Sequence, residues 1–161
     1  MDLGLGGRGF LLTGASRGLG FATARALVDD GARVVVSSRS ADAVSAAVGE
    51  LGGAPSAHGV AADLADPGAA ERLVAEARER LDRLDGALIS VGGPAPGTVL
   101  ETVEADWRSG VESVLLGPLR LVRALVPTWT TARRSRSSCP PLSASRSVTW
   151  RSRTACARGW R

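Results

Sequence analysis

The 161-residue chain contains no tyrosine and no lysine, and it has only one histidine and two cysteines. Any reaction that needs a phenol or a side-chain amine therefore lacks its group in this sequence. Cys139 and Cys156 provide neither a disulfide framework nor a metal-ligand spacing, and the lone His58 adds no ligand set to them. We therefore expect no metal site.

Long apolar runs are also missing, although 44% of the residues are hydrophobic. No stretch approaches the roughly 20 apolar residues that a membrane-spanning helix needs. The first residues, Met1-Asp2-Leu3-Gly4, lack the basic leader and apolar segment of a secretory signal. These absences predict a cytoplasmic protein of one globular domain, without membrane contact.

Acidic residues are absent from the last part of the chain. Residues 1–126 contain twelve arginines and all sixteen acids, a net charge of −4, whereas residues 127–161 contain eight arginines and no acid, a net charge of +8. Strand alternation and helical periodicity also stop after Pro127. We therefore predict a folded part over residues 1–127 and an Arg/Ser-rich tail over 128–161 that is disordered or translated out of frame.

Short apolar runs alternate with amphipathic segments over residues 9–126. The pattern predicts strands over 9–12, 32–37, 57–62 and 87–90, and helices over 18–30, 41–51, 67–81 and 104–126. Such an alternation predicts an α/β fold with a doubly wound parallel sheet, followed by an irregular C-terminal tail.

Two of these helices carry apolar stripes that we expect to be buried. The stripe of the first helix comprises Leu19, Ala22, Ala26 and Leu27. The stripe of the last helix comprises Trp107, Val111, Val114, Leu115, Leu119, Val122 and Leu125.

A glycine-rich turn, Thr13-Gly14-Ala15-Ser16-Arg17-Gly18-Leu19-Gly20, joins the first strand to the first helix. Gly14 allows a sharp turn, Gly18 lets the backbone approach a pyrophosphate, and Gly20 lets the helix pack closely on the strands. The start of the helix adds amide donors and a favourable dipole. The turn therefore predicts a dinucleotide-binding site.

Residues 8–127 resemble the N-terminal half of the classical short-chain dehydrogenase/reductase family, because Thr13–Gly20 matches its TGxxxGxG motif. The sequence is most similar to the group of 3-oxoacyl-acyl-carrier-protein reductases. Asp63-Leu64 follows the third strand, where the family's Asp contacts adenine. The segment 85–93 resembles the fourth strand and its Asn-Asn-Ala-Gly turn, of which only Gly93 is retained.

The resemblance implies a Rossmann fold and hydride transfer between NADP(H) and a small carbonyl or alcohol substrate. Family members are homo-oligomers through the region after Trp107, an assembly that the sequence leaves open for this chain. The family's reaction uses a Ser-Tyr-Lys set, often with an Asn from the long helix. This chain has no Tyr or Lys, and Val114 stands at the Asn position. We therefore predict no catalytic residue and an inactive chain, with Ser38 and Ser90 as structural hydroxyls.

The cofactor preference follows from the end of the second strand. An NAD enzyme usually places an acid there to bind the ribose 2′-hydroxyl, but Ser37-Ser38-Arg39 has no acid until Asp42. The guanidinium groups of Arg17 and Arg39 suit a 2′-phosphate, which favours NADP over NAD. The predicted cofactor-binding residues are Thr13, Gly14, Ser16, Arg17, Gly18, Leu19, Gly20, Ser38, Arg39, Asp63, Leu64, Gly92 and Gly93.

Two other functions stay open. The chain can be a non-catalytic dinucleotide-binding or interaction module, or its tail can bind nucleic acid through eight arginines and the tryptophans Trp129, Trp150 and Trp160. We favour a tail without a selected function. In the reading frame two bases on, Trp150-Arg151 and Trp160-Arg161 each become Leu, Met or Val followed by Ala. With permitted codons chosen over the whole tail, that frame contains a family-like fifth strand. Our hypothesis is that a frameshift produced the tail.

Overall fold

The computed structural model describes residues 3–93 and 96–134 and contains a parallel sheet of four strands, in the order β3-β2-β1-β4. The register places Leu11 opposite both Val35 and Ala87. The strands are β1 (Gly9–Thr13), β2 (Arg33–Ser38), β3 (Ala57–Ala61) and β4 (Gly86–Leu88). The predicted parallel α/β sheet is confirmed, with each strand at or within two residues of its predicted place.

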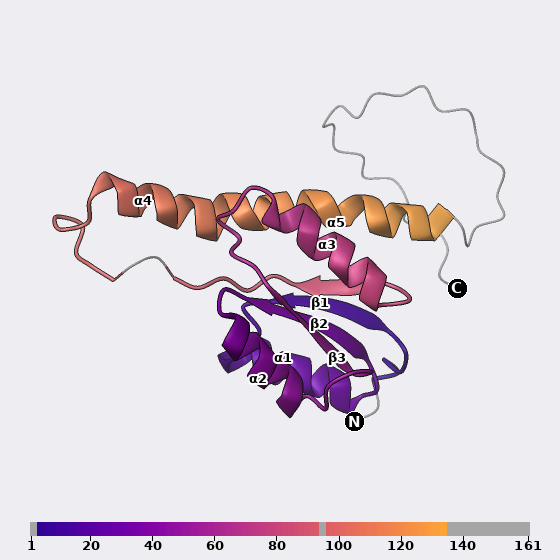
Figure 1. Cartoon of the computed structure of the whole chain (residues 1–161). Helices are drawn as coiled ribbons and strands as arrows, with labels where there is room; N and C mark the ends of the chain where they lie inside the picture. Colours follow the sequence, from indigo (N-terminus) through magenta and orange to yellow (C-terminus); the bar gives the residue numbers. More distant parts are fainter. Residues whose placement is uncertain (1–2, 94–95, 135–161) are drawn as a thin grey trace, which may run out of the picture.

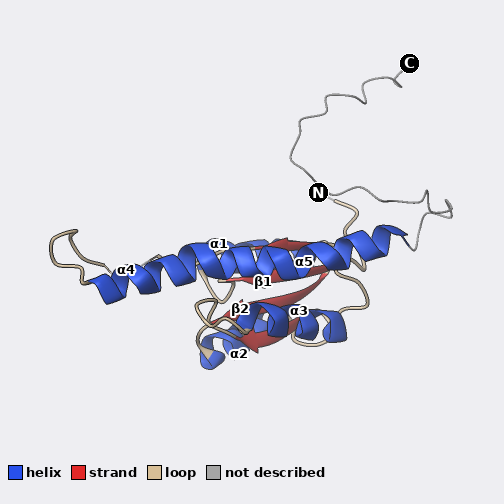
Figure 2. Cartoon of the chain, turned by 90° about the horizontal axis from the view of Figure 1, so that it is seen from above, coloured by secondary structure: helices blue, strands red, loops and turns tan. Residues whose placement is uncertain are grey.

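Helices cover both faces of this sheet, as Figure 1 shows. The helices α1 and α2 lie on one face, and α3 packs with α5 on the other. The helical segments are α1 (Gly18–Asp29), α2 (Ala41–Glu50), α3 (Ala69–Arg80), α4 (Glu104–Val111), the π-helical segment η1 (Glu112–Leu116) and α5 (Gly117–Arg134). The last three follow one another along a single line, and the α4 end projects beyond the sheet (Figure 2). The sheet is therefore doubly wound, as predicted.

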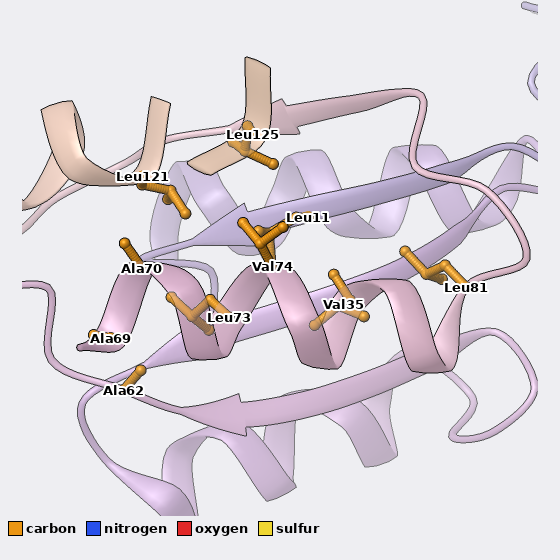
Figure 3. Packing of buried hydrophobic residues seen from close by; sticks show 11 residues of the cluster. Leu11, Val35, Ala62, Ala69, Ala70, Leu73, Val74, Leu81, Leu121 and Leu125 are labelled. Carbon is orange, nitrogen blue, oxygen red and sulfur yellow. The ribbon is translucent and has the colours of Figure 1, made fainter. Parts of the chain in front are cut away.

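Two hydrophobic clusters fill the space between the sheet and its two helical layers. Leu11 and Val35 point to the face covered by α3 and α5, where Leu73, Leu121 and Leu125 meet them (Figure 3). The strand residues that alternate with these point to α1 and α2: Leu12, Val34 and Val36. All of these side chains are fully buried. Each contributes about 1.5–3 kcal/mol through burial, so the sheet and its helices hold each other in place.

The buried face of α1 differs from the predicted stripe. Gly20 and Ala24 are buried, whereas Leu19 is 88% exposed. A Cβ added to Gly20 would lie 2.6 Å from the carbonyl oxygen of Gly14, so this glycine is pressed against the turn that precedes the helix. Gly20 therefore sets the rotation of the helix, and Leu19, about 100° away around the axis, points to solvent.

The buried face of the long helix also differs from the predicted stripe. Of the seven apolar residues expected there, Leu125 alone is buried, and the other six are exposed. The buried residues are instead Gly117, Leu121 and Leu125, spaced four apart, and the two leucines pack against α3 and the sheet. A Cβ on Gly117 would lie 2.3 Å from the carbonyl oxygen of Leu64, so the helix touches the loop after β3. This close contact fixes which face turns inward.

Helix α5 continues beyond Pro127, where the sequence predicted its end. Trp129 follows Leu121 and Leu125 at the same four-residue spacing and is half-buried against their cluster. Pro127 lies on the exposed side of the helix, and the hydroxyl of Thr128 donates to the carbonyl oxygen of Leu125 at 2.6 Å. The apolar contact of Trp129 therefore extends the helix into the predicted tail as far as Arg134. The rest of that tail, 135–161, lies outside the described residues.

The short strand β4 is tied to β1 at its start by Asp85. The Asp85 carboxylate accepts the Gly9 N–H at 3.0 Å and the Arg83 Nε–H at 2.6 Å. The backbone N–H of Asp85 donates to the Gly9 carbonyl oxygen at 2.8 Å. Burial raises the pKa of Asp85, but the hydrogen bonds from Arg83 and Gly9 and the charges of Arg83 and Arg8 outweigh it, so the pKa is lowered. The ionised carboxylate therefore holds the two strands together.

We expect Asp85→Asn to lower the unfolding free energy at pH 7 by about 1–2 kcal/mol, since it removes a charge-assisted acceptor. A lowered pKa stabilises the fold above the unfolded-state value of about 3.9, and this stabilisation is lost as the pH falls through the folded-state pKa. The difference between the two proteins should therefore shrink below about pH 4. Denaturant unfolding at several pH values measures it. Asp82→Asn is the control, because the Asp82 side chain is 93% exposed; equal losses in both variants would contradict the role of Asp85.

Gly117→Ala should lower the unfolding free energy by about 1–3 kcal/mol, because the added methyl group collides with the Leu64 backbone and displaces α5. Thermal unfolding measures the change. Gly49→Ala is the matched control, since Gly49 is an exposed helical glycine with no atom within 4 Å of an added Cβ. We expect that variant to be about 0.5–1 kcal/mol more stable than the unchanged protein. Stabilisation in both variants would show that the contact with Leu64 is not tight.

Candidate functional site

A cleft of about 520 Å³ opens where the four parallel strands end. Ten of the thirteen predicted cofactor-binding residues line it: Thr13, Gly14, Ser16 and Arg17 from the turn after β1, Ser38 and Arg39 from the end of β2, Asp63 and Leu64 after β3, and Gly92 and Gly93 after β4. The other three, Gly18, Leu19 and Gly20, form the first turn of α1 and are not among the lining residues. The fold therefore gathers segments that lie up to 80 residues apart.

Thr13, the last residue of β1, connects this strand to the segment after β4 at the floor of the cleft. Its hydroxyl donates to the carbonyl oxygen of Ser90 at 2.8 Å and accepts the N–H of Ser90 at 3.0 Å. The Thr13 residue is 2% exposed, and both hydrogen bonds are part-buried. The hydroxyl is thereby occupied by the protein backbone, and Thr13 shapes the cleft by holding the segment after β4 against β1.

Gly14 makes the sharp turn that follows Thr13. Its φ of 58° lies in the left-handed region, and an added Cβ would lie 2.8 Å from the carbonyl oxygen of Ser90. Gly18, with a φ of 60°, has no atom within 4 Å of an added Cβ, so its side faces open space. The turn therefore combines a tight contact on the inner side with an open backbone on the outer side.

The start of α1 supplies hydrogen-bond donors beside this turn. Arg17 is the N-cap residue, its side chain makes no capping hydrogen bond, and the first turn of the helix contains no acid. The first N–H groups of a helix have no carbonyl partner within the helix, and the dipole makes this end positive. The N-terminal end of α1 therefore favours an anionic group.

Two arginines add positive charge at one side of the cleft. Arg17 and Arg39 are both exposed, and within residues 3–93 and 96–134 neither forms an ion pair with a carboxylate, whereas seven other arginines do. The Arg39 side chain extends towards the turn after β4, where its Nη2 lies 3.9 Å from the place of a Cβ on Gly92. Both guanidinium groups can therefore pair with an anion in the cleft.

Asp63 is held in place by its own loop. Its Oδ1 accepts the N–H of Ala65 at 3.0 Å, which leaves Oδ2 as a further acceptor at an exposed position. The neighbouring Leu64 is half-buried against α5 through its contact with Gly117. The loop after β3 thus offers an acceptor next to an apolar wall.

Sequence reasoning missed seven lining residues: Ser37, Ser40, Ala43, Ala62, Ser90, Val91 and Ser113. Four of them, Ser37, Ser40, Ala62 and Val91, adjoin predicted residues in the chain, so their neighbours were the available signal. Ser40 also caps α2, since its hydroxyl accepts the N–H of Ala43 at 3.2 Å. Ser113 is different, because it comes from η1 and no sequence motif marks it. The expected helix position, Val114, is exposed and is not a lining residue.

The residues present fit a dinucleotide. An open glycine backbone, an uncapped helix start and two cations without carboxylate partners surround one cleft at the carboxyl ends of parallel strands, where α/β sheets bind nucleotides. In the described part of the chain, no group of three or more His, Cys, Asp or Glu side chains is placed to hold a metal ion. None of the helices described here is long and apolar enough to span a membrane.

This arrangement defines the class of a dinucleotide-binding α/β domain. The family model described as short chain dehydrogenase matches residues 9–137, and the chain therefore belongs to the short-chain dehydrogenase family of NAD(P)-dependent oxidoreductases. The chain is 34% identical over 123 residues to serine 3-dehydrogenase of Agrobacterium fabrum, covering 73% of this chain and 47% of that enzyme. It is 35% identical over 125 residues to human mitochondrial dehydrogenase/reductase SDR family member 2, covering 76% and 45%.

Solved structures agree with this assignment. The L-sorbose reductase of Gluconobacter frateurii, determined with NADPH and L-sorbose, superimposes with a TM-score of 0.74 at 28% identity, over 82% of this chain and 51% of that one. A short-chain dehydrogenase/reductase of Brucella melitensis has the same TM-score and identity, over 80% and 54%. The chain spans about half the length of the proteins it matches.

Thr13→Val keeps the shape of the side chain and removes its hydroxyl, so it should leave the part-buried N–H and C=O of Ser90 without their partner. We expect a loss of about 1–3 kcal/mol in unfolding free energy, measured by denaturant titration. Thr23→Val is the matched control, because the Thr23 hydroxyl bonds the Leu19 carbonyl oxygen on the exposed side of α1. That control should change stability by less than about 0.5 kcal/mol. Equal changes in the unfolding free energy of the two variants would contradict a stabilising role of the Thr13–Ser90 hydrogen bonds.

Proposed function

We propose that this chain binds NADP(H) in the cleft formed by β1 to β4 and does not complete a reductase reaction on its own. The observation that carries the proposal is the meeting of the glycine turn, the uncapped start of α1 and the unpaired guanidinium groups of Arg17 and Arg39 in one cleft. The backbone around Gly14 and Gly18 would hold the pyrophosphate, and the loop at Asp63 would hold the adenine end.

The preference for NADP over NAD rests on charge at the end of β2. Ser38 and Arg39 occupy the place where an acid would bind a ribose 2′-hydroxyl, and an acid there would repel a 2′-phosphate. Arg39 lies in the cleft with Arg17, so two cations are available for the additional phosphate. The solved relative bound to NADPH supports this choice of cofactor.

The proposed lack of turnover rests on the side chains of the chain itself. A bound NADP(H) supplies the hydride, while the protein must position the substrate and move a proton to or from its oxygen. The Tyr and Lys that the family uses for the proton are absent from all 161 residues. The hydroxyls of Ser90 and Ser113 lie in the cleft without a basic side chain among the described lining residues that could activate them. We therefore infer a binding protein derived from carbonyl reductases.

Titration calorimetry with NADPH and NADH tests this function. We expect NADPH to bind about tenfold or more tightly than NADH, and Arg39→Ala to weaken NADPH by about 10–100-fold with little effect on NADH, since a charge-assisted contact to phosphate is lost. Arg78→Ala is the matched control, because Arg78 is an exposed arginine of α3 outside the cleft.

The same samples should not oxidise NADPH when a small ketone or aldehyde is added. Failure of the unchanged protein to bind either nucleotide would overturn the proposed function. Equal binding of NADPH and NADH would overturn the NADP preference alone, and steady oxidation of NADPH would overturn the lack of turnover.

Three finer predictions from the sequence belong to this proposal. We propose that the parent enzyme was similar to 3-oxoacyl-acyl-carrier-protein reductases, that residues 128–161 arose by a frameshift, and that the protein is cytoplasmic. Sequencing of the gene tests the frameshift: a shifted frame that restores a reductase C-terminus supports it, and the absence of such a frame contradicts it.

A further inference from the structure

Ser113 is the one residue of the α4–η1–α5 helix, as far as the structure describes it, that lines the cleft. It lies in the π-helical segment η1 and is half-buried. An ion pair spans this segment, because Arg120 Nη1 lies 2.8 Å from Glu112 Oε2. Single π-helical turns within α-helices are frequent at functional sites, where they change the direction of a side chain.

The contact between Gly117 and Leu64 places Ser113 at one particular part of the cleft. Gly117 follows Ser113 by four residues and therefore lies on the same face of the helix, one turn further on. Since Gly117 touches the Leu64 backbone, Ser113 lies beside the loop of Asp63 and Leu64. That loop follows β3, which lies next to β2 and on the far side of it from β1 and β4. Ser113 therefore belongs to the side of the cleft at the ends of β2 and β3.

The hydrogen bonds of Ser113 determine what it can offer to a ligand. Its hydroxyl donates to the carbonyl oxygen of Ser109 at 2.9 Å, and the Gly110 carbonyl oxygen lies at 3.3 Å. The hydroxyl hydrogen is thus used within the helix, which leaves the oxygen of this cleft-lining residue as an acceptor for a ligand. Asp63 Oδ2 is a second acceptor at the same side. Two acceptors in one wall favour a ligand that presents N–H donors.

We propose that the Ser113 hydroxyl accepts a hydrogen bond from the amino group of the purine base and makes this subsite selective for adenine over hypoxanthine. The inference rests on the proposed function, because it assumes that a dinucleotide binds in this cleft. Hypoxanthine has a carbonyl oxygen in place of the amino group and would direct a lone pair at two acceptors. The structure assigns this role to Ser113 and not to Val114, the residue that the resemblance placed at the family's helix position.

Calorimetry on the full chain tests the proposal with three probes: NADPH, adenosine 2′,5′-bisphosphate, and the NADPH analogue in which hypoxanthine replaces adenine. We expect the unchanged protein to bind NADPH about 5–10-fold more tightly than the hypoxanthine analogue. Ser113→Val should weaken NADPH and the bisphosphate by the same factor, about 5–10-fold, and leave the hypoxanthine analogue within about twofold. Ser113→Thr has the size of the Val variant but keeps the hydroxyl, so it should retain the preference for adenine.

Ser109→Ala is the matched control on the helix, since Ser109 is exposed and bonds Ser113 through its backbone oxygen. It should leave the binding of all three probes unchanged. Thermal unfolding of each variant shows whether the protein stays folded. Because Thr and Val have the same size, a change in affinity that comes from size alone should appear in both variants.

The outcomes separate this inference from the proposed function. If the unchanged protein binds neither NADPH nor the bisphosphate, the proposed function fails, and this inference fails with it. If NADPH binds but Ser113→Val binds it as tightly, only the role of Ser113 fails. A loss of NADPH affinity without a loss for the bisphosphate would place Ser113 at the other half of the nucleotide and overturn the assignment. Equal weakening of all three probes would show a general loosening of the cleft and overturn it as well.

Discussion

The cleft depends on the contact between the backbones at the ends of β1 and β4. Strand β4 pairs with β1 over only three residues, so the hydrogen bonds between these strands do not fix the segment that follows β4. Asp85 ties its start to Gly9, and Thr13 ties Ser90, beyond its end, to β1. Gly14 permits the second tie, because any side chain there would collide with the Ser90 carbonyl oxygen. The wall of the cleft at Gly92 and Gly93 therefore rests on one buried hydroxyl and one missing Cβ.

A second glycine, Gly117, determines the position of the wall on the opposite side of the cleft, at the loop after β3. Gly117 lets the long helix reach the Leu64 backbone, and Leu121 and Leu125 continue that contact into the core. Leu121 and Leu125 close the hydrophobic cluster on this face of the sheet, while the apolar row on the other side of the helix, from Trp107 to Val126, stays exposed. The floor and these two walls of the cleft therefore rest on contacts among the described residues, in a chain that spans about half the length of its relatives.

The sequence predicted the features that depend on local pattern. Strand and helix order and the parallel sheet follow from apolar periodicity, and the cleft residues of the turn after β1 follow from the glycine motif, since both act over a few neighbouring residues. The predicted cleft residues after β3 and β4 came from the resemblance to the family, and those at the end of β2 from the lack of an acid there. The sequence did not predict which side of a helix turns inward. Leu19 and Val114 belong to plausible apolar stripes, but the close contacts of Gly20 and Gly117 decide the rotation, and those contacts join distant segments. Ser113 and the continuation of α5 to Trp129 were missed for the same reason.

The proposed nucleotide binding and a proton transfer would need different kinds of groups. The groups that favour an anionic nucleotide are backbone amides and guanidinium groups at strand ends, and the first 93 residues supply all of them. Proton transfer needs a side chain that gains and loses a proton near neutral pH. The described lining residues include no His, Cys, Tyr or Lys, and a guanidinium keeps its proton at all such pH values. The Asp63 carboxylate lies at the base end of the proposed nucleotide site and is bonded to its own loop. The proposed function therefore assigns nucleotide binding to this cleft and no proton transfer to its described lining residues.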